Sequence, residues 1–183
     1  MRGTGKSSIG RLLASLLGFA FVDTDAAIET LAGVRIADLV ASHGWEHFRA
    51  LERQVVAHIA TGDRQVIATG GGTLIDEENA KQLKARGVVV LLLCAVPILQ
   101  RRLGAGENRP SLTGQGSAVA ELEHVWNARR GRYLAVADLR YDVSAESADS
   151  MLDLRHKARA IQELLRPTMS HHRTDQPGEH GEV

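Results

Sequence analysis

Short apolar runs of strand length alternate with amphipathic runs of helix length along most of this chain. The apolar runs span 19–23, 65–69, 88–95 and 139–143. Helical periodicity of the apolar residues fills the intervals between these runs and follows the last one, over about 149–165. Strands joined by helical crossovers form a parallel sheet with helices on both faces, so we predict a three-layer α/β fold.

The pattern also predicts individual elements. Run 88–95 is apolar throughout, which is typical of a central parallel strand, and we expect it to be the most strongly buried strand. Helices are expected over about 9–17, 26–31, 36–44, 47–60, 76–85, 97–103 and 118–136. Residues 1–165 therefore form one predicted domain. Residues 166–183 contain almost no apolar side chains and are expected to be disordered.

The composition narrows the class of protein. The 183 residues include 22 basic and 22 acidic side chains, so no net field favours nucleic acid or an anionic membrane. Cys94 is the single cysteine, which excludes an internal disulfide and fits a reducing cytosol. The longest apolar run, 88–99, is too short to span a bilayer and contains Pro97. Because no signal-peptide pattern is present, we predict a soluble, cytoplasmic protein.

The opening residues, MRGTGKSS, look like the end of a phosphate-binding loop, G-x-x-x-x-G-K-S/T, whose first glycine would precede Met1. Gly3 and Gly5 allow the backbone to curl so that successive N–H groups surround an anion at a helix N-terminus. Lys6 would reach the β- and γ-phosphates of a nucleotide, and the Ser7 hydroxyl would bind Mg²⁺. The alternative is a glycine-rich start to an ordinary helix.

Two carboxylates, Asp23 and Asp25, stand at the end of the first expected strand. Residues i and i+2 of a strand share a face, so both could point into one site outside the carboxyl edge of the sheet. One could bind a metal through water while the other orients a hydroxyl. The alternative is that Asp25 caps the helix that follows it.

Glycines and arginines mark further candidate positions. The triple glycine 70–72 follows a strand and favours a close backbone approach to a ligand or a sharp turn. Arg49 and Glu52 lie at i, i+3 on an expected helix, where an ion pair is the default interpretation. Arg109 lies in a Gly-, Asn- and Pro-rich segment, about 103–117, that is typical of a mobile lid. Arg129 lies on a later helix, where a solvated basic face is the default.

Six segments together resemble the shikimate kinase family, in order and over about residues 1–145. They are RGTGKSSIGRLLA, FVDTDAAIE, GWEHFRALE, VIATGGGT, NRPSLT and RRGRYLAVADL. They are similar to that family's phosphate loop, its F-x-D-S/T-D-x-x-I-E segment, its F-R-x-x-E helix, its triple-glycine turn, its lid arginine and its R-x-x-x-Y-x-x-x-A helix. The resemblance implies a kinase of the phosphate-loop fold that uses ATP and Mg²⁺ to phosphorylate the 3-hydroxyl of shikimate. It also implies a monomer.

The resemblance also implies residue roles. The implied ATP contacts are Gly3, Thr4, Gly5, Lys6, Ser7, Ser8 and Arg109. Ser7 would hold Mg²⁺, with Asp23 supporting the metal through water. Asp25 would bind the attacking hydroxyl and assist its deprotonation, and Lys6, Asp25 and Arg109 would form the catalytic set. Arg49 and Arg129 would grip the substrate carboxylate, and Gly71 would donate a backbone N–H to the substrate.

In that family the sheet has the order 2-3-1-4-5, and its first strand precedes the phosphate loop. We expect that strand 1 is missing from this chain, leaving a gap about two strand spacings, roughly 10 Å, wide. Met1 would then be an internal methionine of a longer reading frame, preceded by a glycine and about five apolar, β-branched residues. We expect the chain without this strand to be poorly stable.

Two other functions fit parts of the pattern. A related kinase could act on another polyol acid such as gluconate, but Arg49, Arg129 and the triple glycine favour shikimate. A ligand-sensing domain on a kinase-like fold, once part of a longer regulatory protein, is the non-catalytic alternative. Such a sensor would be free to lose Lys6, Ser7, Asp25 or Arg109, and all four are in place.

Overall fold

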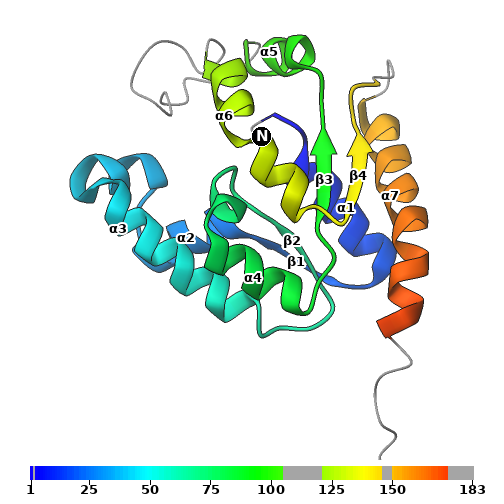
Figure 1. The fold of residues 1–183 in the computed structure, drawn as a ribbon, viewed down its shortest axis with the longest axis horizontal. Helices are drawn as coiled ribbons and strands as arrows, with labels where there is room; N and C mark the ends of the chain where they lie inside the picture. The colour runs from blue at the N-terminus through cyan, green and yellow to red at the C-terminus, as the bar shows by residue number, and fades with distance from the viewer. Residues whose placement is uncertain (2, 105–120, 146–149, 173–183) are drawn as a thin grey trace, which may run out of the picture.

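The computed structural model describes residues 1, 3–104, 121–145 and 150–172. In chain order they form α1 (Lys6–Leu17), β1 (Ala20–Asp23), α2 (Thr24–Ala32), α3 (Ile36–Ile59), β2 (Gln65–Ala68), the 3-10 turn η1 (Thr73–Ile75), α4 (Glu77–Ala85), β3 (Val90–Leu93), α5 (Val96–Gly104), α6 (Glu121–Val136), β4 (Leu139–Asp142) and α7 (Ser150–His172) (Figure 1). The predicted alternation of strands and helices is confirmed.

Glycine and aspartate residues set the limits of several elements. α1 begins after Gly5 and ends at Gly18, which takes a left-handed φ of 66°. Asp23 and Asp76 cap α2 and α4, because each side chain accepts hydrogen bonds from N–H groups of the first helical turn. Within α3, Gly44 has φ 78° and ψ 172°, which no helix contains. The predicted separation of 36–44 from 47–60 is therefore confirmed.

The strands form two parallel pairs, β1 with β2 and β3 with β4. Ala20 lies opposite Gln65 in the first pair, and Val90 lies opposite Leu139 in the second. Among the described residues no backbone hydrogen bonds between strands join the two pairs. Residues of β3 and of the turn after β2 line the same cavity. In the predicted order 2-3-1-4-5 the strand expected to be missing is strand 1, so β1 to β4 correspond to strands 2 to 5. The two observed pairs are therefore the predicted neighbours 2-3 and 4-5.

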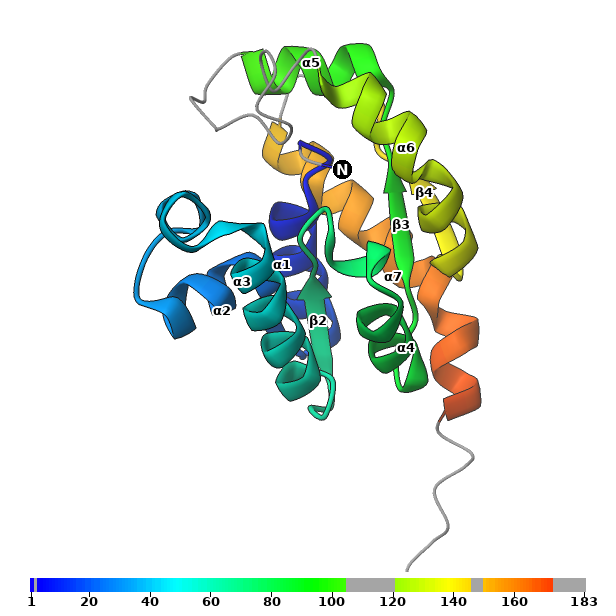
Figure 2. The ribbon, with the colours of Figure 1, turned by 60° about the vertical axis from the view of Figure 1, so that its left-hand side comes forward.

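Two hydrophobic cores place helices on opposite faces of the strands (Figure 2). One core packs α1 and α7 against both strand pairs, with Ile9, Leu13, Val143, Ala158, Ile161 and Leu165 buried and Val66 and Val90 beside them. The other packs α2 and α3 against the first pair, with Ile28, Leu39, Phe48, Val55 and Ile59 buried and Val22 and Ile67 beside them. Val66 and Ile67 are adjacent in β2, and their side chains point to opposite faces of the sheet, because successive residues of a strand alternate in direction. The three-layer α/β fold is confirmed.

Two predictions about individual elements differ from the structure. β3 is half-buried along its whole length, so it is not the most strongly buried strand, because a cavity borders it. α7 runs past Arg166 to His172, so the predicted disordered tail does not begin at Arg166; extending an existing helix costs little, even without apolar residues. Residues 105–117 of the candidate lid, which include Arg109, and residues 173–183 lie outside the described residues. None of the described helices is long and apolar enough to cross a membrane.

Candidate active site

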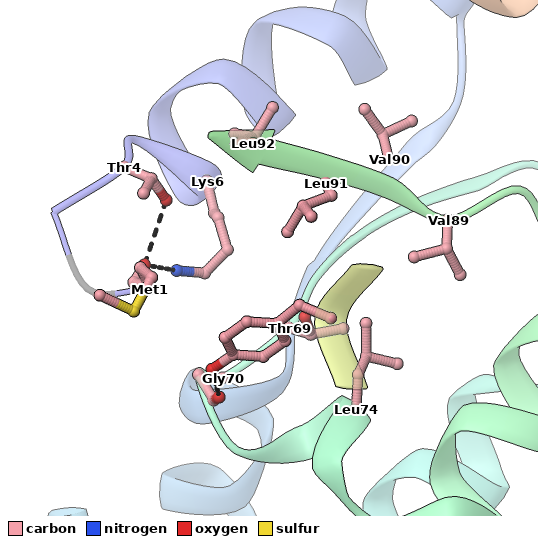
Figure 3. A pocket seen from close by; sticks show the side chains of 12 residues that line it. Met1, Thr4, Lys6, Thr69, Gly70, Leu74, Val89, Val90, Leu91 and Leu92 are labelled. Carbon is pink, nitrogen blue, oxygen red and sulfur yellow. Dashed lines mark hydrogen bonds between the residues drawn. The ribbon is translucent and has the colours of Figure 1, made fainter. Parts of the chain in front are cut away.

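The phosphate-loop residues fold back on themselves at the start of α1. Gly3 and Gly5 have φ values of 76° and 84°, the left-handed region that glycine enters without strain. Thr4 between them is buried, and its hydroxyl donates to the Met1 carbonyl at 3.1 Å. The Lys6 ammonium donates to the same carbonyl at 2.5 Å (Figure 3). The glycines therefore produce the tight curl that their spacing predicts, at a helix N-terminus that attracts anions.

The electrostatics of this region disfavour positive charge. The pKa of the Met1 amino group is lowered from 8.0 to about 4, first because the group is buried and then because of the nearby Lys6 and Arg129 charges. Burial disfavours charge of either sign, whereas the two nearby cationic side chains favour an anion. Lys6 from the loop and Arg129 from α6 thus contribute to one electropositive region, although 123 residues of sequence separate them.

Ser7 and Asp23 form an oxygen pair beside the loop. The Ser7 hydroxyl donates to Asp23 Oδ2 at 2.6 Å, while Asp23 Oδ1 accepts from the N–H groups of Asp25 and Ala26. Asp23 is therefore the cap of α2, and the alternative that Asp25 caps this helix is wrong. Hydroxyl and carboxylate oxygens are the hard ligands that Mg²⁺ binds, so the donor set fits that ion.

Asp25 does not lie on the strand, as the shared-face interpretation required, because α2 begins at Thr24. Its exposed carboxylate instead reaches the triple-glycine turn, where Oδ1 lies 2.5 Å from the place a Gly70 Cβ would occupy. The Thr24 hydroxyl accepts from the Gly70 N–H at 2.8 Å. The start of α2 therefore positions both a carboxylate and the turn.

Two of the three glycines in the turn have a close neighbour where a Cβ would lie. A Cβ on Gly70 would meet Asp25, and one on Gly72 would lie 2.5 Å from the Arg49 guanidinium. Gly71 has no atom within 4 Å of the place of a Cβ, so its open side borders free space. The close approaches at Gly70 and Gly72 are therefore to Asp25 and Arg49, and Gly71 is open on the side where a Cβ would lie.

Arg49 is held in place by a buried carboxylate. Its guanidinium forms an ion pair with Glu52, which is 1% exposed, so the predicted helical pair is confirmed. Glu52 also accepts from the Thr73 hydroxyl at 2.9 Å. The guanidinium lies 5.0 Å from the Phe48 ring centroid, and its side chain remains 32% exposed. Arg49 is thus oriented from inside the protein and still accessible to a ligand.

Two side chains of α6 reach the other side of the turn. Tyr133 donates its hydroxyl hydrogen to the Gly71 carbonyl, and Arg129 Nη1 approaches the same oxygen at 3.4 Å. Lys6, Gly70, Gly71 and Tyr133 all line one cavity. The phosphate loop and the triple-glycine turn therefore face each other across a shared space.

Of the predicted site residues, Thr4, Lys6 and Gly71 line this cavity. The others connect to the loop or the turn through contacts: Ser7 with Asp23, Asp25 and Arg49 with the triple-glycine turn, and Arg129 with the Gly71 carbonyl, while Ser8 is exposed in the first turn of α1. Sequence reasoning missed the roles of Thr24, Thr73 and Tyr133. The sequence did offer an indication for Tyr133, because a residue one helical turn after Arg129 lies on the same face of the helix. It offered none for Arg102, which donates to the Gly3 and Val143 carbonyls.

A parallel α/β fold with a phosphate loop at the N-terminus of α1 and a Ser–Asp pair beside it defines a phosphate-loop kinase of small molecules. Comparisons with known proteins identify the branch. The sequence matches the family described as shikimate kinase over residues 2–165. The chain belongs to the shikimate kinase family.

Individual relatives agree with this assignment. The chain is 40% identical over 166 residues to a shikimate kinase from Synechococcus elongatus, covering 91% of this chain and 85% of the relative. It is 42% identical over 152 residues to one from Geobacter metallireducens, covering 82% and 83% of the two chains. Among solved structures, a shikimate kinase from Acinetobacter baumannii in complex with shikimate superposes with a TM-score of 0.79 at 31% identity, over 91% of this chain and 89% of that one.

Proposed function

We propose that this protein transfers the γ-phosphate of ATP to the 3-hydroxyl of shikimate, as in the biosynthesis of aromatic amino acids. The observation that carries the proposal is the cavity lined jointly by Lys6 of the phosphate loop and Gly71 of the triple-glycine turn, with Arg129 beside it. A phosphate donor held on one side and a carboxylate-bearing acceptor held on the other would meet there. The membership of the shikimate kinase family supports the same acceptor.

Residues of the loop and of β1 would hold the nucleotide. The N–H groups of residues 3–8 surround the phosphates, and Lys6 releases the Met1 carbonyl to contact the transferred phosphoryl group. Ser7 and Asp23 would hold Mg²⁺, Asp23 through water, and the ion would neutralise charge on the phosphates. Arg109, outside the described residues, would close on the phosphates from the lid.

Residues from three helices and the turn would hold the acceptor. Arg49 and Arg129 offer planar guanidinium groups that pair with a carboxylate in two-point fashion. Gly71 has the free space needed for a substrate to approach its backbone N–H. Asp25, exposed beside Gly70, would accept a hydrogen bond from the 3-hydroxyl.

The reaction follows from this positioning. The shikimate oxygen forms a bond to the γ-phosphorus, and the bond from that phosphorus to the bridging oxygen of ADP breaks. The hydroxyl proton passes to Asp25, which assists deprotonation, while Lys6 and Arg109 stabilise the charge that spreads over the phosphoryl oxygens. Catalysis is then mainly alignment and charge neutralisation, as in other phosphoryl transfers. We also propose that the protein acts as a cytoplasmic monomer.

An ADP-release assay tests the proposal. With ATP and Mg²⁺, we expect ADP release when shikimate is present and none above background when gluconate replaces it, with shikimate 3-phosphate identified by mass and phosphorus NMR. Lys6→Ala should lower kcat by about 10²-fold or more, because a preorganised phosphate contact is lost. Lys81→Ala, which removes an exposed lysine of α4, should leave kcat within about twofold.

Two results would overturn the proposal. Turnover with gluconate in preference to shikimate would assign the chain to a different acceptor. Binding of both ATP and shikimate by calorimetry, without ADP release, would favour the ligand-sensing domain instead.

A further inference from the structure

The Gly71 carbonyl is the point at which α6 contacts the triple-glycine turn. Tyr133 donates its phenolic hydrogen to this oxygen, and Arg129 approaches it at 3.4 Å, the long end of hydrogen-bonding distance. Tyr133 is 6% exposed, and its ring stacks on Trp126 with centroids 6.3 Å apart and planes 25° apart. The phenol is therefore fixed by packing, with its hydroxyl directed at one backbone oxygen.

The rest of the turn is held by other groups. The Gly70 N–H is bound by Thr24, and the Gly70 carbonyl accepts from the Thr73 N–H at 3.3 Å. The Gly72 carbonyl accepts from the Ile75 N–H at 3.0 Å. Within the part of the chain that the structure describes, the peptide between Gly71 and Gly72 is held by the contacts that α6 makes with the Gly71 carbonyl. Because a peptide is planar, the direction of that carbonyl fixes the whole unit.

Glycine cannot fix this peptide through a side chain of its own. Gly71 has open space where a Cβ would lie, and its neighbour Gly72 is pressed against the Arg49 guanidinium. A rotation of the 71–72 peptide would move Gly72 relative to Arg49. The contact from α6 therefore affects both the backbone that faces the cavity and the arginine on α3.

Without Tyr133, the Arg129 guanidinium would have two competing acceptors, the Gly71 carbonyl and the substrate carboxylate. The guanidinium contacts the Gly71 carbonyl in this structure, yet the proposed function directs it to the substrate carboxylate. If Tyr133 satisfies the carbonyl, Arg129 can turn to the substrate without leaving a polar atom unpaired, which is costly in a partly buried site. The buried Tyr133 hydroxyl keeps its bond to the carbonyl, while the half-buried Arg129 guanidinium exchanges between the carbonyl and the substrate.

We propose that Tyr133 is a positioning residue for the acceptor: its hydrogen bond to the Gly71 carbonyl holds the triple-glycine turn in its binding shape and leaves Arg129 available for the substrate carboxylate. The inference rests on the proposed function. It concerns shikimate rather than ATP, because the hydrogen bond of Tyr133 goes to the triple-glycine turn.

Tyr133→Phe removes only the hydroxyl and keeps the ring on Trp126. We expect the KM for shikimate to rise about 3- to 10-fold, the effect of losing one neutral hydrogen bond, with the KM for ATP and kcat each within about twofold of the original protein. The matched control is Tyr141→Phe, since Tyr141 is the other tyrosine and packs in the core beneath α1 and α7. It should leave all three parameters unchanged. A second readout is the Kd of shikimate measured by calorimetry without nucleotide, which should rise by the same factor.

The outcomes separate this inference from the function on which it rests. An unchanged KM for shikimate in Tyr133→Phe, or an equal rise in both KM values, overturns the positioning role while turnover by the original protein keeps the kinase function. If the original protein binds shikimate without turnover and Tyr133→Phe binds it more weakly, the kinase function fails and the positioning role stands. Absence of both binding and turnover in the original protein overturns both.

Discussion

Glu52 is a buried charge whose main contribution is to place another residue. Its carboxylate is 1% exposed, and it accepts hydrogen bonds from Arg49 on its own helix and from Thr73 in η1. A charge so deeply buried is tolerated only when it is paired and hydrogen-bonded. Glu52 therefore connects the arginine proposed to bind the acceptor with the turn proposed to face it.

Glu52→Gln should lower the free energy of unfolding by about 1–3 kcal/mol, because Arg49 loses a charged partner in a buried setting. The control is Asp38→Asn, which breaks the Arg35–Asp38 pair at the same i, i+3 spacing on an exposed surface. That change should cost less than about 1 kcal/mol. Urea unfolding curves measure both. Equal effects of the two substitutions would show that burial of Glu52 adds nothing.

At the level of elements, α3 owes its shape to one residue. Gly44 has φ 78° and ψ 172°, a region that only glycine enters freely, and it separates Ile36–His43 from the longer second segment. Both segments contribute to one core, with Leu39 from the first and Phe48 from the second. The break thus lets the chain turn so that both segments pack on α2 and the first strand pair, and Arg49 follows directly after Phe48.

Gly44→Ala should destabilise the protein by about 1–3 kcal/mol, since alanine would be strained in this conformation although open space surrounds it. Gly131→Ala in α6 is the matched control: Gly131 also has open space around it but lies inside a helix. It should stabilise the protein by up to about 1 kcal/mol. Thermal unfolding monitored by circular dichroism measures both changes. A stabilised Gly44→Ala protein would mean that the backbone break is not required.

For the whole molecule, two hydrogen-bonded carboxylates link stability to pH in the same direction. Burial tends to raise the pKa of Asp76, but hydrogen bonds from the Asn79 N–H and from Arg53 outweigh it and lower that pKa below 3.8. Burial tends to raise the pKa of Asp138, but hydrogen bonds from Lys84 and the Val89 N–H outweigh it and lower that pKa below 3.8. That stabilisation is present above pH 3.8 and is lost as the pH falls through the folded value.

The free energy of unfolding should therefore fall as the pH drops below about 4, because the unfolded chain then binds protons that the folded carboxylates do not. Urea midpoints at one-unit pH intervals measure this profile. Asp138→Asn removes one of the two titrations, so this variant should lose less stability in acid than the original protein does. A flat profile below pH 4 in the original protein would contradict the lowered pKa of both carboxylates.

Much of this architecture was readable in the sequence because local patterns carry it. The curl at Gly3 and Gly5, the break at Gly44 and the alternation of strands and helices depend on backbone freedom and on apolar spacing within a few residues. The extent of α7 beyond Arg166 was missed because continuing a formed helix costs little even without apolar residues. The half-burial of β3 was missed because it depends on the cavity beside the strand.

The sequence alone was enough to identify the family, because six motifs in order specify a phosphate loop, its Ser–Asp pair and the arginines around an acceptor. Only the tertiary structure decided which groups hold these residues: Asp23 rather than Asp25 caps α2, Glu52 holds Arg49 against Gly72, and Tyr133 binds the Gly71 carbonyl. Motif residues lie close together in the sequence, so their pattern is visible there. Their supports come from other elements, and contacts between distant segments exist only once the layers have packed.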